Sequence, residues 1–162
     1  MFLNGRRTTE SGFTYIALIF AIALFGIGSA HFAVLYSEQQ KRVREEELLR
    51  VGKEYANAIR SYYLASPGLQ PEFPQQLSDL LTDHRFVGTR HHLRRIYIDP
   101  ITQNAEWGLV RDSRGGIQAV YSKSESAPKK SANFPAWVQV STSAATYSDW
   151  KFQYAQLKSR RQ

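Results

Sequence analysis

The amino-acid sequence predicts an α+β fold in which one long N-terminal helix precedes a small antiparallel β-sheet. Residues 13–66 contain no proline, and their apolar residues have helical spacing. After residue 68, short apolar runs alternate with Pro, Gly, Asn and Ser, which is the pattern of short strands joined by turns. The 162 residues leave room for one small domain after the helix. A large multidomain enzyme is therefore excluded.

The first part of the predicted helix is apolar enough to cross a membrane. Residues 13–36 include no Asp, Glu, Lys or Arg, and a helix needs about 20 apolar residues to span a bilayer. Arg6 and Arg7 precede this segment, and basic residues favour the cytoplasmic side. The sequence thus predicts a single membrane pass, with residues 1–12 in the cytoplasm and residues 37–162 on the other side.

Two further interpretations of this segment stay open. A secretory signal peptide also starts with basic residues, although its apolar part spans roughly 7–15 residues and ends at small residues. Gly28, Ser29 and Ala30 offer such a cleavage site. A plain, uncleaved signal anchor would have the same composition, so hydrophobicity alone does not separate these possibilities.

The junction between the polar leader and the apolar segment carries a more specific pattern. Residues 11–16 read SGFTYI, so Gly12 stands directly before Phe13, which opens the apolar helix. This resembles the signal of type IV prepilins. The resemblance implies that residues 1–12 are a leader, that a prepilin peptidase cuts between Gly12 and Phe13, and that the new N-terminus is methylated. A glycine, which has no side chain, suits a cut at the membrane surface.

One position departs from the family pattern. Pilins normally have a glutamate four residues after the phenylalanine, and here that residue is Ala17. In the family, the glutamate is thought to pair with the N-terminal amine of a neighbouring subunit. A minor pseudopilin at the filament tip of type II secretion systems also lacks it. Ala17 therefore argues against a major, repeating subunit.

Residues 37–66 continue the helix as an amphipathic segment. Its apolar stripe recurs mostly every three or four residues and consists of Val43, Leu48, Val51, Tyr55, Ile59 and Tyr62. Pro67 and Gly68 predict the end of the helix. A coiled-coil stalk is the alternative, but the stripe is shorter than three heptads and rich in tyrosine. We therefore expect this stripe to pack on the following domain.

Residues 67–162 are expected to form a β-rich globular domain. Leu77, Leu80 and Leu81 indicate a short helix that starts near Gln76 or Ser78. Strands are predicted at residues 96–98, 107–110 and 117–121, a surface loop at 122–133, and a last strand within 146–157. A helical spine on a small antiparallel sheet is the pilin-like architecture. Asp99-Pro100 followed by Trp107 also resembles the pseudopilins of type II secretion.

The resemblance implies a mechanical function rather than an enzymatic one. It implies a pseudopilin of a type II secretion or type IV pilus-like machine, anchored in the inner membrane, with its C-terminal domain periplasmic. Its helix would assemble into a periplasmic filament that supports protein secretion. The implied partners are other pilin or pseudopilin subunits, the prepilin peptidase and the inner-membrane assembly platform. The residues expected to pack in membrane and filament are Phe13, Ile16, Ala17, Phe20, Leu24, Gly26 and Gly28.

The residues that usually carry catalysis or bind metals are sparse. The chain has no cysteine, which excludes thiolate metal sites, and no Gly-rich phosphate loop or nucleophile elbow. His84, His91 and His92 lack metal-binding spacing and are expected to be solvated loop residues. The loop region 122–145 has Glu125 as its only acid, too few oxygen ligands for calcium. We expect no cofactor and no bound metal.

Two basic clusters contain no acidic residue. They consist of Arg85, Arg90, Arg94 and Arg95 in one segment, and of Lys151, Lys158, Arg160 and Arg161 at the C-terminus. We expect a solvated surface or a contact with acidic partner subunits. The alternative is a minor pilin that binds DNA through this basic face during DNA uptake, because neutralised phosphates dominate such affinity.

Overall fold

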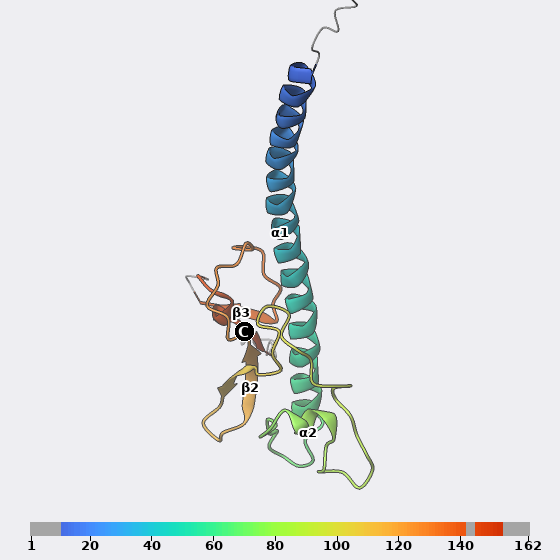
Figure 1. The fold of residues 1–162 in the computed structure, drawn as a ribbon. Coiled ribbons are helices and arrows are strands. Elements are labelled where there is room, and N and C mark those ends of the chain that lie inside the picture. Colours follow the sequence, from blue (N-terminus) through green and yellow to red (C-terminus); the bar gives the residue numbers. More distant parts are fainter. Residues whose placement is uncertain (1–10, 142–144, 154–162) are drawn as a thin grey trace, which may run out of the picture. The chain divides into compact units, whose positions relative to one another are not determined.

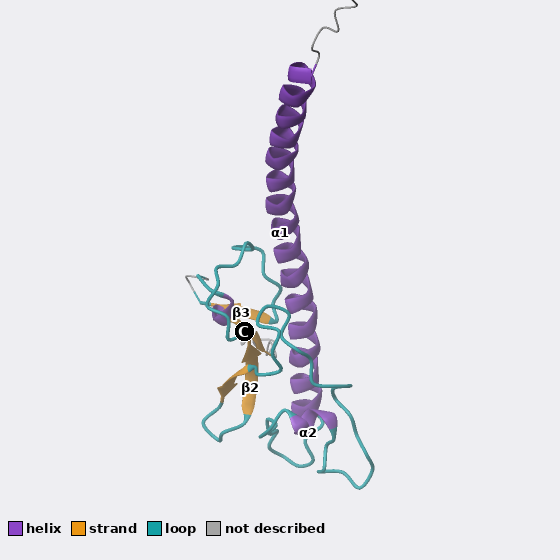
Figure 2. Ribbon diagram, in the orientation of Figure 1, coloured by secondary structure: helices purple, strands orange, loops and turns teal. Residues whose placement is uncertain are grey.

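The computed structural model describes residues 11–141 and 145–153, and of these the side chains of residues 11 and 26–35 are not described. The protein has an α+β fold with an N-terminal helix and a small antiparallel sheet (Figures 1 and 2). The elements are α1 (Ser11–Leu64), α2 (Ser78–Leu81), β1 (Gly108–Arg111), β2 (Ile117–Tyr121), β3 (Val138–Val140), the 3₁₀ turn η1 (Tyr147–Asp149) and β4 (Trp150–Gln153). The chain divides into two compact units, with the division after Gln40 inside α1.

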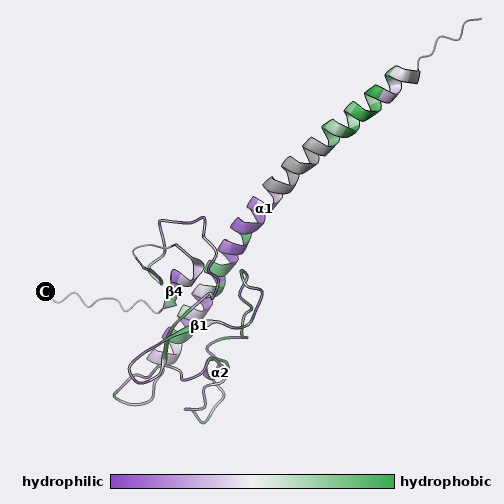
Figure 3. Ribbon diagram, turned by 60° about the vertical axis from the view of Figure 1, so that its left-hand side comes forward, coloured by the Kyte–Doolittle hydropathy of each residue, from purple (hydrophilic) through white to green (hydrophobic). Residues whose placement is uncertain are grey.

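The first unit contains the N-terminal turns of α1. Residues 12–25 are exposed all round the helix, with Phe13 as much as 78% exposed, and Figure 3 shows the hydrophobic character of these turns. Among the described residues, no helix combines the length and the hydrophobicity that crossing a bilayer requires. The predicted packing residues Gly26 and Gly28 lie in the range 26–35, whose burial is not described.

In the second unit, the C-terminal half of α1 packs on one face of a four-stranded sheet. The strand order is β1-β2-β4-β3, and every neighbouring pair is antiparallel. The register places Leu109, Val120, Phe152 and Val138 in one row across the four strands. From Leu48 to Tyr62, the helix buries the predicted apolar stripe in the same hydrophobic core. Val43 is the exception, because it is 59% exposed.

Helix α1 and the sheet approach each other closely at Gly52. A Cβ atom on Gly52 would stand 2.4 Å from Cδ1 of the Phe152 ring. A glycine inside a helix costs about 1 kcal/mol relative to alanine, and here its missing side chain makes room for the aromatic ring. This contact accounts for the interior glycine of the amphipathic segment.

A buried carboxylate fastens the segment before β3 and the turn η1 to the helix. Glu45 of α1 accepts a hydrogen bond of 2.8 Å from the hydroxyl of Tyr147 and another from the backbone N–H of Lys129. Burial, followed by the bond to Glu45, raises the pKa of Tyr147 above its ordinary value. The predicted surface loop at 122–133 is therefore tied to α1 at Lys129.

The strand predictions agree with the structure at three places and differ at two. The strand at 117–121 coincides with β2, the one at 107–110 overlaps β1, and the last one overlaps β4. The predicted strand at 96–98 is wrong. There, the N–H of Tyr97 donates to the Tyr55 hydroxyl (3.1 Å), and its C=O accepts from Nε1 of Trp107 (2.8 Å). Side chains thus take the backbone hydrogen bonds that a neighbouring strand would make. The second difference is β3, a strand that the sequence pattern does not predict.

The Asp99-Pro100 element is a turn held by a buried side chain. Oδ1 of Asp99 accepts from the N–H of Ile101 (2.8 Å), and Oδ2 accepts from Oγ of Ser122 (2.6 Å). Asp99 is fully buried. Because Ser122 directly follows β2, this carboxylate joins the turn before β1 to the end of the neighbouring strand.

Candidate functional site

The predicted processing site lies in the first turn of α1. The helix begins at Ser11, and Gly12 and Phe13 are both exposed. A Cβ on Gly12 would meet nothing within 4 Å.

The predicted packing residues beyond it share this exposure. Ile16, Ala17, Phe20 and Leu24 are all exposed. Residues 12–25 carry no ionisable carboxylate or cation. An apolar helix of this kind needs either lipid or other helices around it.

The structure corrects the place of Arg85 in the predicted basic surface. Its guanidinium donates from Nε to Oδ1 of Asp83 (2.9 Å) and from Nη2 to Oδ2 (2.8 Å). It also donates to the C=O of Tyr62 (2.9 Å) and to Oγ of Ser66 (2.8 Å), and it stacks 3.5 Å over the Tyr62 ring. With only 18% of the side chain exposed, Arg85 is a structural residue that joins the segment after α2 to the end of α1.

The structure describes four of the other predicted basic residues. Arg90, Arg94 and Arg95 are exposed, with Arg90 stacked 5.0 Å from the Phe86 ring centre. Arg90, Arg95 and Lys151 line three different hollows. Lys158, Arg160 and Arg161 lie outside the described residues. Within residues 11–141 and 145–153, Arg90, Arg95 and Lys151 therefore do not meet in one hollow.

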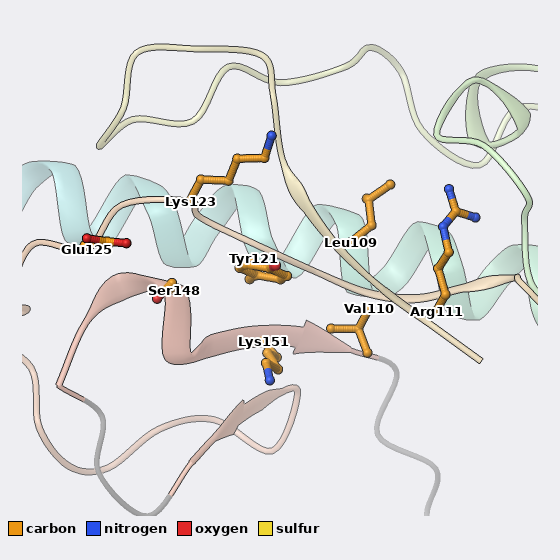
Figure 4. A pocket seen from close by; sticks show the side chains of 8 residues that line it. All are labelled: Leu109, Val110, Arg111, Tyr121, Lys123, Glu125, Ser148 and Lys151. Carbon is orange, nitrogen blue, oxygen red and sulfur yellow. The ribbon is translucent and has the colours of Figure 1, made fainter. Parts of the chain in front are cut away.

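The hollow around Lys151 lies on the sheet and is shown in Figure 4. It measures about 670 Å³ and is lined by Leu109, Val110, Arg111, Tyr121, Lys123, Glu125, Ser148 and Lys151. Two of its cations already have partners. The ammonium of Lys123 lies 3.2 Å from Glu106, and Arg111 donates to the backbone C=O of Gln75 and Gly115. This mixture of charges gives the hollow no strong preference for an anion.

The histidines occupy different environments, and the expectation that His92 is solvated is wrong. His84 and His91 are exposed, but the His92 side chain is only 1% exposed. Its Nε2 lies 3.1 Å from Oδ2 of Asp83, and its Nδ1 lies 2.8 Å from Oγ of Ser61. The ring also packs edge-on against Tyr62. Ser61 and Tyr62, near the end of α1, thus pack against the buried His92 ring.

Asp83 is the centre of this cluster, and its side chain is fully buried. The hydrogen bonds from the Arg85 guanidinium, followed by those from the Arg85 backbone N–H and His92, hold the pKa of Asp83 well below its ordinary value of 3.8. The carboxylate therefore stays ionised at neutral and mildly acidic pH.

This shift predicts a loss of stability in acid. Because the pKa of Asp83 is lower in the folded than in the unfolded chain, the unfolded state binds a proton first as the pH falls below about 4. The stabilisation is complete above that pH and declines towards pH 2. We expect urea unfolding of the protein to show this decline, and Asp83→Asn to show a smaller one. Equal declines in both proteins would assign the acid sensitivity to other carboxylates.

Comparison of this chain with protein-family models, with curated proteins and with solved structures found no match.

Proposed function

We propose that this protein is a pilin-like subunit of a type II secretion or type IV pilus-like machine, anchored in the inner membrane by residues 13–36. The observation that carries the proposal is the junction at Gly12-Phe13, where a basic leader meets an apolar helix. The helix that follows bears exposed apolar side chains on all sides from Phe13 to Phe25. In this proposal, lipid surrounds these side chains first, and the helices of other subunits replace the lipid during filament assembly.

The C-terminal half of α1 and its sheet support a mechanical role. Gly52 lets the sheet approach the helix closely, and Glu45 ties the segment before β3 and η1 to it. These contacts hold the sheet and the turn η1 on the C-terminal half of α1. The exposed Arg94 and the side chains near Lys151 are then available for contacts with acidic surfaces of neighbouring subunits.

Ala17 refines the place of the subunit in the filament. A major subunit that pairs a carboxylate with a neighbour's N-terminal amine needs an acid at this position, and alanine cannot supply one. An unpaired charge in an apolar environment would be costly, so a subunit without that neighbour is more stable with an apolar residue there. We therefore infer a minor subunit, at or near the tip of the filament.

N-terminal mass spectrometry tests this proposal. We expect the protein co-expressed with a prepilin peptidase to begin at a methylated Phe13, and Gly12→Val to leave the leader uncut because a branched side chain obstructs the cleaved bond. Gly5→Val is the matched control and should be processed normally. A protein that still begins at Met1, or one cut near Ala30, would contradict the proposal.

A further inference from the structure

A serine, a histidine and an aspartate lie in a line at the end of α1. Oγ of Ser61 is 2.8 Å from Nδ1 of His92, and Nε2 of the same ring is 3.1 Å from Oδ2 of Asp83. Ser61 belongs to α1, whereas Asp83 and His92 belong to the segment that follows α2. This cluster has no part in the mechanical role proposed above.

The hydrogen-bonding capacity of the three groups fixes their roles. The ionised Asp83 carboxylate can only accept, so the hydrogen between it and His92 lies on Nε2. In the neutral imidazole, Nδ1 then carries a lone pair, and this lone pair faces the hydroxyl of Ser61. This is the arrangement in which a histidine takes the proton of a serine nucleophile and a buried carboxylate holds the tautomer. Asp83 is a positioning residue here, because it acts through His92.

The serine opens on a hollow large enough for a small ligand. Ser61 is exposed and lines a space of about 490 Å³ together with Asn57, Arg60, Leu64, Ala65 and Arg90. This volume lies within the usual range for small-molecule sites, about 300–1,000 Å³. Asn57 precedes Ser61 by one helical turn and so lies on the same face of α1. The amide of Asn57 and the guanidinium of Arg90 are donors that can stabilise negative charge beside the serine.

We propose that Ser61 is the nucleophile of an esterase site that accepts small carboxylic esters, with His92 as its general base. Oγ of Ser61 bonds to the carbonyl carbon of the ester while its proton moves to Nδ1 of His92. The carbonyl electrons move to the carbonyl oxygen, whose charge the donors of Asn57 and Arg90 would stabilise. Collapse of this intermediate breaks the bond to the alcohol, which leaves with the proton from Nδ1.

Water completes the cycle. It adds to the acyl group on Ser61 and gives a proton to Nδ1 of His92. The bond to Oγ then breaks, the proton returns to Oγ, and the carboxylic acid leaves. One ester and one water thus yield one acid and one alcohol, and no cofactor is consumed.

Ser66, a second serine near this cluster, shows how a purely structural serine differs from Ser61. Ser66 also lies beside Arg85, but its hydroxyl receives hydrogen bonds from the Arg85 guanidinium and from the backbone N–H of Glu72. The Ser66 hydroxyl in turn donates to the backbone C=O of Glu72 (3.3 Å), which is not a base. Ser61 differs from Ser66 in two respects, because it faces an imidazole lone pair and also lines a hollow.

Covalent labelling tests the proposal on the full-length protein in detergent micelles. We expect a fluorophosphonate probe to modify Ser61, identified by peptide mass mapping, and p-nitrophenyl acetate to be hydrolysed. Ser61→Ala should abolish both, and His92→Gln should lower both rates by about 100-fold or more. Ser113→Ala, which changes an exposed turn serine, is the matched control and should retain both.

Labelling of the wild type no faster than of Ser61→Ala, or labelling confined to another serine, would overturn the proposal. Far-ultraviolet circular dichroism checks that each variant is folded. If His92→Gln unfolds, the comparison of Ser61→Ala with the wild type still decides the outcome, because Ser61→Ala removes only a hydroxyl group from an exposed residue. Neither result depends on cleavage at Gly12, so the esterase proposal and the filament proposal fail independently.

Discussion

Replacing Arg85 with methionine is expected to lower the free energy of unfolding by about 3–5 kcal/mol. The substitution removes two hydrogen bonds to Asp83, which is fully buried, and leaves that carboxylate without its cation. It also removes the donors to Tyr62 C=O and Ser66. An unpaired buried charge accounts for most of the expected loss, since methionine keeps much of the side-chain volume.

Urea unfolding monitored by tryptophan fluorescence measures this effect in detergent micelles. Arg94→Met is the matched control, because Arg94 is an exposed arginine of the same basic segment, and its cost should stay within about 0.5 kcal/mol. Asp83→Asn combined with Arg85→Met should be less destabilised than Arg85→Met alone, since the buried charge is gone. Similar stabilities of Arg85→Met and Arg94→Met would mean that Arg85 is a surface residue after all.

Replacing Phe152 with alanine is expected to cost about 3–5 kcal/mol, the usual range for a buried phenylalanine. Phe152 is fully buried in the centre of the core. Its ring contacts Gly52 on the helix side and lies edge-on to Trp107, at 6.5 Å between ring centres. Its loss opens a cavity between α1 and the sheet that neither rigid element can close.

The neighbouring glycine makes this prediction sharper. Gly52→Ala should destabilise the wild type by about 1–3 kcal/mol, because the new methyl group overlaps the Phe152 ring. In the Phe152→Ala background, the same substitution should stabilise the protein by about 1 kcal/mol, the helix propensity of alanine over glycine. Denaturation of the four proteins of this double-mutant cycle measures the change of sign.

Gly88→Ala is the control, because a Cβ at Gly88 would meet nothing within 4 Å. If Gly52→Ala is stabilising in the wild type as well, the close approach of helix and sheet at this position is wrong.

Much of the fold could be predicted from local patterns. The absence of proline and the spacing of apolar residues indicated a helix that the structure assigns to Ser11–Leu64, and alternation between two turns indicated β2. Residues 96–98 have the same β-branched and aromatic character, yet their backbone bonds to the side chains of Tyr55 and Trp107. The residues of β3 follow a proline, and this strand forms because β4 lies beside it.

The two candidate sites, Gly12-Phe13 and the Ser61–His92–Asp83 cluster, also differ in how far the sequence alone predicts them. Gly12-Phe13 is a contiguous pattern, so the sequence alone points to it. Ser61 and His92 are 31 positions apart, and no fixed spacing links them to Asp83. Arg85 was expected among exposed cations because nothing in the adjacent residues shows that it turns towards a buried acid.

The sequence by itself determined where this protein has an apolar helix, a change from polar to apolar residues at Gly12-Phe13 and an amphipathic stripe, because each depends on residues close together in the chain. Only the tertiary structure decided the strand order β1-β2-β4-β3, the contact of Gly52 with Phe152 and the burial of Asp83, Arg85 and His92. These features depend on which segments, far apart in the sequence, pack against each other and so become buried. A charged or polar side chain can be buried when distant segments of the chain supply its hydrogen-bond partners. The composition of the neighbouring residues does not reveal those partners.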